Sequence, residues 1–185
     1  RWIGYYSQDF STVEVNSSFY GLPSEKSIIT WKESVQGNFV FAVKASRFIT
    51  HLKRLNNVED ALQTFLARVR LLGSKLGPVL YQLPATFSRN DERLEAFLKL
   101  LPDDLHHVFE FRSPTWFSSD VYELLEQYRV GFCSYHLVGT SCPLVATGSI
   151  AYFRFHGSEG LYWGSYSKQE LQEWANKLIG ISRGK

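Results

Sequence analysis

The stretch HVFEFR, residues 107–112, decides how this chain folds. Side chains alternate between the two faces of a strand, so Phe109 and Phe111 take one face while Glu110 and Arg112 take the other. The aromatic face is suited to packing beneath helices, and the charges come late in the run. This pattern predicts a strand with one apolar face and a polar C-terminal end on its other face.

Five other short runs rich in β-branched and aromatic residues occupy 11–15, 39–45, 78–83, 130–135 and 150–155. Most of them also end in polar residues on one face: Glu14 with Asn16, Lys44, Gln82, and Arg154 with His156. Because the C-terminal ends of parallel strands meet at one edge of a sheet, these side chains are predicted to gather there.

Helical patterns separate most of these runs. The expected N-caps of four helices are Ser24, Asn57, Asn90, and either Ser118 or Ser119, with Gly73 and Pro102 as stop signals for two of these helices. Ser167 with Glu170 forms a capping box before a fifth helix. Residues 1–8 resemble the last turns of a helix, whereas 137–149 show no helical period and predict a loop or a single turn. Strands that alternate with helices predict a parallel sheet, and without an internal linker the chain is one domain, 1–185.

Two parallel-sheet architectures compete for this pattern. A doubly wound nucleotide-binding sheet favours a glycine-rich first turn, and no G-x-G-x-x-G or P-loop sequence is present. In a (β/α) barrel the active site lies at the C-terminal ends of the strands, where this sequence places its charges. The predicted fold is therefore an α/β, TIM-type (β/α) barrel with about six parallel strands and covering helices.

Six motifs in chain order strengthen this prediction: TVEVNSSFYGLP, FVFAVKASRFITHLKRL, GPVLYQLPATF, FEFRSPTWF, AYFRFHG and YSKQELQEWA. Together they resemble the YecE-like domain-of-unknown-function family, DUF72, along essentially the whole chain. The resemblance implies a TIM-type barrel without an assigned activity. It carries over the polar strand-end positions Glu14, Asn16, Lys44, Arg47, His51, Gln82, Glu110, Arg112, Arg154 and His156.

The sequence departs from the family pattern at both ends. The initial I-G-T-S-G-W type of strand and the final V-Y-V-Y-F-N-N type of strand are absent, and the first residue is not methionine. The barrel is therefore expected to be incomplete, with the strands of Glu14 and Arg154 as unpaired edges that face a gap.

Composition excludes several classes of protein. The 20 basic and 18 acidic residues leave a formal charge of +2, too small for binding nucleic acid by bulk electrostatics. Cys133 and Cys142 are too few and too isolated for a disulfide scaffold or a thiolate zinc site. No run is long and apolar enough to span a membrane, and no secretory signal is present, so a cytoplasmic location and no membrane partner are expected.

The leading functional hypothesis is an enzyme that binds an anionic small molecule, phosphate- or carboxylate-bearing and sugar-like, at the barrel mouth. Glu110 is the expected general acid/base, with Lys44 and His156 as further catalytic candidates for isomerase, lyase or hydrolase chemistry. For Lys44, electrostatic binding is favoured over a Schiff-base role. The expected substrate-binding residues are Glu14, Asn16, Tyr20, Arg47, His51, Gln82, Arg112, Trp116 and Arg154.

Other interpretations remain open at this point. The charges could form a purely structural salt-bridge lattice, or the barrel could bind a ligand without turnover. A metal held by Glu14, Glu110, His136 and His156 is disfavoured by the surrounding cations, so no cofactor or metal is expected. Nucleic acid is the alternative partner, with phosphates on Arg47, His51, Lys53 and Arg54 and bases on the loop aromatics Phe19, Tyr20, Trp116, Tyr162, Trp163 and Tyr166.

Overall fold

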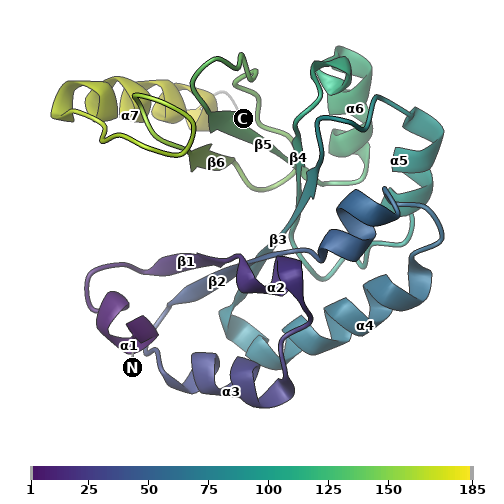
Figure 1. The fold of residues 1–185 in the computed structure, drawn as a ribbon, viewed down its shortest axis with the longest axis vertical. Helices are drawn as coiled ribbons and strands as arrows, with labels where there is room; N and C mark the ends of the chain where they lie inside the picture. The colour runs from purple at the N-terminus through teal and green to yellow at the C-terminus, as the bar shows by residue number, and fades with distance from the viewer. Residues whose placement is uncertain (1, 184–185) are drawn as a thin grey trace.

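The computed structural model describes residues 2–183. In that range six parallel strands pair in sequence order: β1 (Thr12–Val15), β2 (Val40–Lys44), β3 (Leu76–Leu83), β4 (His107–Phe111), β5 (Gly131–His136) and β6 (Tyr152–Phe155). Figure 1 shows that the sheet curls into an open half-barrel, with β1 and β6 at its two free edges. The expected six parallel strands and the two expected edge strands are confirmed.

Helices cover the outer side of the curl (Figure 1). They are α3 (Glu25–Glu33), α4 (Glu59–Val69), α5 (Asp91–Leu98) and α6 (Ser119–Gln127), with α7 (Lys168–Arg183) beside β6 and the short α1 (Trp2–Tyr6) and α2 (Ser17–Tyr20) near β1. Single turns η1 (Phe48–Leu52), η2 (Arg70–Lys75) and η3 (Pro114–Trp116) complete the connections. Residues 137–149 contain no helix, as expected.

Most expected helix starts are confirmed by their hydrogen bonds. The side chains of Ser24 and Asn90 accept from the backbone N–H groups three residues later, at 3.1 and 2.8 Å. Ser167 and Glu170 form a reciprocal capping box, with bonds of 3.2 and 2.7 Å. The prediction for Asn57 is wrong: it adopts a left-handed backbone with φ of 51°, and α4 begins after Val58.

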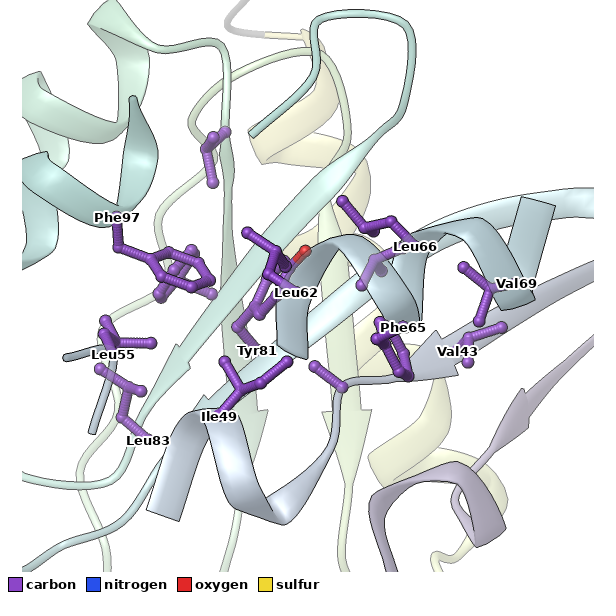
Figure 2. Close-up of a cluster of buried hydrophobic side chains, with 14 of the residues drawn as sticks. Val43, Ile49, Leu55, Leu62, Phe65, Leu66, Val69, Tyr81, Leu83 and Phe97 are labelled. Carbon is purple, nitrogen blue, oxygen red and sulfur yellow. The ribbon is translucent and has the colours of Figure 1, made fainter. Parts of the chain in front are cut away.

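The main core lies between the outer face of the sheet and the helices. Figure 2 shows Leu62, Phe65, Leu66 and Val69 of α4 facing β2 and β3, where they meet Val43, Tyr81 and Leu83. These side chains are almost completely buried. The helical period of α4 and the strand alternation therefore bring two apolar faces together, which is the dominant stabilising contribution in such a fold.

The inner face of the curl carries a much smaller apolar cluster. Leu80, Val108 and Cys133, from β3, β4 and β5, are fully buried there, with Tyr152 packed against them. One alternation period further along the strands the inner face becomes charged. The curl thus has an apolar floor and a polar mouth at the C-terminal ends of the strands.

Candidate functional site at the mouth of the half-barrel

Glu110, near the end of β4, is the centre of the polar mouth. Its side chain is fully buried, and both carboxylate oxygens accept hydrogen bonds from guanidinium groups. Arg112 Nε donates to Oε1, and Arg154 Nη1 donates to Oε2 at 2.6 Å. A fully buried carboxylate is stable only with such compensation, so the two arginines fix its charge and position.

Arg154 also joins the two free edges of the sheet. While Nη1 contacts Glu110, Nη2 donates to Oε1 of Glu14 at 2.7 Å, 140 residues away in the chain. The other oxygen of Glu14 accepts from the Tyr152 hydroxyl at 2.8 Å. Burial opposes the charge on Arg154, but Glu110 and Glu14 outweigh it and raise the pKa of the guanidinium. The arginine therefore holds β6 against both β1 and β4.

Arg112 connects Glu110 with His156. Its Nη2 lies 2.8 Å from His156 Nε2, and its guanidinium carbon lies 4.3 Å from the centre of the Tyr135 ring. Burial, together with the charges of Arg154 and Arg112, lowers the pKa of His156 to about 4. The imidazole is therefore neutral near pH 7, and its Nε2 accepts from Arg112.

Lys44, at the end of β2, differs from the other cations of the mouth. Its ammonium lies 4.3 Å from the centre of the Phe19 ring, and no carboxylate among residues 2–183 lies within ion-pair distance. Burial, then the charge of Arg154, lowers the pKa of Lys44, while Glu110 and Glu14 act in the opposite direction. Lys44 is thus a half-buried amine without a counter-ion in this part of the chain.

His51 lies beside this lysine. Its ring packs edge-on against Phe19 at 4.9 Å, and its Nδ1 lies 2.9 Å from the Thr50 hydroxyl. Burial and the charges of Lys44 and Arg47 lower the pKa of His51 to about 4. A neutral imidazole and an aromatic ring therefore border the amine.

A cleft of about 670 Å³ opens between the two free edges of the sheet. Its lining includes the polar residues Glu14, Asn16, Arg154 and His156, whereas Lys44, Glu110 and Arg112 are not among the residues that line it. This volume is within the range of small-molecule sites. The charged mouth thus borders a cavity of suitable size.

The remaining expected substrate-binding residues are more peripheral. Asn16 and Arg47 are exposed, Tyr20 is 82% exposed beside Phe19, and Gln82 pairs in register with Glu110 on the neighbouring strand. Trp116 lies in the loop after β4, in η3, as expected, but its side chain does not face a ligand. It is fully buried in the outer core, where Nε1 donates to the Phe87 carbonyl at 2.7 Å. That position leaves no surface of Trp116 open to a ligand.

Two loop aromatics, Tyr162 and Trp163, are exposed near the mouth, whereas His136 packs against α7. Tyr162 and Trp163 are 67% and 61% exposed, and Tyr162 packs edge-on against His156 at 5.2 Å. His136, by contrast, lies 2.6 Å from the Tyr166 hydroxyl and packs against Trp174 of α7. Within residues 2–183 no three His, Cys, Asp or Glu side chains group closely enough to hold a metal ion.

Three aromatic side chains contact the charged groups of the mouth, and the sequence pattern singles out only Phe19 among them, as a loop aromatic that could stack on a base. Tyr152 anchors Glu14, Phe19 covers Lys44, and Tyr135 lies under Arg112 with a buried hydroxyl that has no hydrogen-bond partner among residues 2–183. The alternation that selects Arg154 also places Tyr152 inward, and the same rule places Tyr135 inward on β5. Phe19 is in a short helix, where no strand period could point to it.

A known protein family matches the whole chain. The family described as "Protein of unknown function DUF72" matches residues 1–185. The UPF0759 protein YecE of Escherichia coli K12 is 33% identical over 114 residues, 61% of this chain and 42% of YecE. The UPF0759 protein YunF of Bacillus subtilis 168 is 26% identical over 208 residues, covering 94% of this chain and 73% of YunF. The match thus spans less than half the length of YecE.

Two solved structures of DUF72 proteins have the same fold. The protein from Enterococcus faecalis V583 superposes with a TM-score of 0.83 at 20% identity, covering 98% of this chain and 81% of that one. The protein from Thermotoga maritima MSB8 gives a TM-score of 0.84 at 26% identity, covering 97% and 76%. Within residues 2–183 no helix has the length and apolar character needed to cross a bilayer.

Proposed function

The chain belongs to the DUF72 family, and we propose that the mouth of its half-barrel binds an anionic small molecule and carries out acid/base chemistry on it. The ligand bears phosphate or carboxylate and has a sugar-like size. In this proposal the half-barrel is part of a TIM-type (β/α) barrel. Its parallel strands, which pair in sequence order from β1 to β6, and the helices on its outer side are compatible with that fold.

The observation that carries this proposal is the unpaired Lys44. Two carboxylates, Glu14 and Glu110, face two guanidinium groups, and both histidines nearby are neutral, so the ammonium is in excess. A structural lattice alone would balance its buried charges, since an uncompensated one is unfavourable. An anion bound at the mouth, between Lys44 and Arg154, would supply the missing counter-charge, and Arg154 is the cation of this pair that also lines the cleft.

Arg112 and Arg154 complete the anion site, and Glu110 with His156 supplies acid/base groups. In the present state the basic atoms of Glu110 and His156 accept from the guanidiniums. An anionic ligand competes for the same donors, because bidentate arginine contacts suit phosphate and carboxylate equally well. Ligand binding would therefore release a carboxylate oxygen or an imidazole nitrogen for proton transfer.

Calorimetric titration with inorganic phosphate and with a sugar phosphate tests the proposal. The Lys44→Met variant should weaken binding about tenfold, or about 1.4 kcal/mol. Lys177→Met is the matched control, because Lys177 also lies over a ring, that of Trp174 at 4.6 Å, but is exposed on α7. Equal affinities of wild type and Lys44→Met would contradict the proposal, and binding without turnover of any sugar phosphate would favour a non-catalytic barrel.

A nucleic-acid partner is the second candidate. Arg47 and Lys53 are exposed on the rim, and Phe48 between them is 43% exposed beside the Lys53 ammonium. A cation next to an open ring suits a phosphate with its base. Oligonucleotide binding that weakens with salt and is lost in Lys53→Gln would favour this candidate over the first.

A further inference from the structure

The basic atoms at the mouth differ in whether they are free to react. Both oxygens of Glu110 accept from arginines, and both oxygens of Glu14 accept from Arg154 and Tyr152. His156 Nε2 lies against Arg112. Lys44 Nζ forms no hydrogen bond or ion pair with residues 2–183. The amine is therefore the nucleophile that needs no rearrangement before it can act.

The surroundings of Lys44 suit an amine that exchanges between neutral and charged forms. Glu14 from β1, Glu110 and Arg112 from β4, and Arg154 from β6 all act on it electrostatically, and Arg47 and His51 lie on the adjoining turn. The carboxylates of this group are already paired with arginines. Their attraction for the ammonium is thus largely offset by the guanidiniums, and burial disfavours the charged form.

We propose that Lys44 forms an imine with the aldehyde or ketone group of an anionic substrate. This inference rests on the proposed function, because the anion site holds the carbonyl next to the amine. It extends the proposal by naming the substrate class, a carbonyl compound that also bears phosphate or carboxylate. Lysines near other cations in partly desolvated sites are the ones suited to this reaction.

The step balances without an external oxidant or reductant. The neutral amine attacks the carbonyl carbon, a C–N bond forms, and the C=O π electrons move to oxygen, which takes up the proton released by nitrogen. The resulting carbinolamine loses its hydroxyl as water when the oxygen takes up from solvent the proton that the Lys44 ammonium gave up on becoming neutral, and the nitrogen lone pair forms the C=N bond. The net change is ammonium and carbonyl to protonated imine and one water molecule. Phe19, whose ring already lies 4.3 Å from the ammonium, stabilises the cationic imine in the same way.

Reductive trapping tests the inference with pyridoxal 5′-phosphate, which carries both an aldehyde and a phosphate. The full chain is incubated with the probe near pH 7, reduced with borohydride, digested, and the modified lysines are quantified by mass spectrometry. Lys177 is the internal control, because it also lies over a ring, that of Trp174 at 4.6 Å, but is exposed. Lys44 should be labelled several-fold faster than Lys177, and inorganic phosphate should slow only Lys44.

A Lys44→Arg variant keeps the positive charge but cannot form an imine. It should abolish the trapped product at this position and retain phosphate binding, whereas Lys177→Arg should leave labelling of Lys44 unchanged. If Lys44 reacts no faster than Lys177 while phosphate still binds, the imine is refuted and the anion site stands. If phosphate neither binds nor slows labelling, both proposals fail.

Discussion

Arg154 offers the sharpest test of how the mouth is built. Its guanidinium bridges Glu110, fully buried, and Glu14, whose side chain is 18% exposed, and it is itself 12% exposed. Replacing it with methionine keeps much of the apolar stem but removes both bridges. Glu110 would keep Arg112, and Glu14 would keep Tyr152.

The magnitude follows from these burials. Removing one partner of a buried ion pair destabilises a protein by about 3–5 kcal/mol, because the remaining charge stays desolvated. Since Glu110 retains a second arginine and Glu14 is partly hydrated, the lower end applies, about 3 kcal/mol. This is a large fraction of the 5–15 kcal/mol, roughly, that separates folded from unfolded states of such domains.

Urea unfolding followed by circular dichroism measures the loss. Arg70→Met is the matched control, since Arg70 also contacts both oxygens of one carboxylate, Asp104, at 2.5 and 2.7 Å, but with side chains 41% and 63% exposed. The control should lose less than about 1 kcal/mol. Equal losses in the two variants, or a loss below about 1 kcal/mol for Arg154→Met, would refute the view that Arg154 holds the free edges together.

Three further predictions concern single side chains. Tyr152→Phe should lower the unfolding free energy by about 2 kcal/mol by removing a bond to a carboxylate, whereas Tyr135→Phe, which removes an unpartnered hydroxyl, should change it by less than about 0.5 kcal/mol; similar urea midpoints would contradict this. Burial lowers the pKa of His107 from 6.5 to about 4, so below pH 6.5 the unfolded chain binds a proton at this residue that the folded chain does not bind. The unfolding free energy should therefore fall by up to about 3 kcal/mol as the pH is lowered from 6.5 to about 4. Urea titrations at several pH values should show a shallower fall in His107→Gln. Trp116→Phe should lower the unfolding free energy by about 2 kcal/mol and leave the affinity for phosphate unchanged. A weaker affinity for phosphate without a loss of stability would show instead that Trp116 contributes to ligand binding.

The strand ends could be predicted because alternation is a local property. A period of two residues places Glu110 and Arg112 on one face of β4 whatever the rest of the chain does, and the same rule applies to Arg154 and His156 on β6. Helix caps such as Asn90 are local for the same reason, since their bonds reach only three residues along the chain. The failure at Asn57 marks the limit of this logic, because a loop with left-handed backbone shifts the helix start by one residue.

The partners within the mouth depend instead on the curvature of the sheet. The curl brings Glu14 to Arg154 across the two free edges and leaves Arg112 to Glu110 and His156, a choice of partners that the strand pattern does not specify. The burial of Trp116 also depends on tertiary packing. Its place in a strand-end loop suggested a side chain open to a ligand, but the ring stacks on Phe111 in the outer core. Ion pairs and burial are set by distances between elements far apart in the chain, which no local period encodes.

The sequence by itself thus determined the parallel α/β architecture and the inward polar face, since both follow from side-chain period and from the order of strands and helices, whereas the two edge strands were expected from the resemblance to the family pattern. Only the tertiary structure decided that Glu110 is held by two arginines, that Glu14 and Arg154 join the edges, and that Lys44 is left without a counter-ion in the described part of the chain. The physical reason is that the charge of a side chain is compensated by the groups that lie within about 4 Å of it. The curvature of the sheet determines which groups those are, and the strand pattern does not specify them.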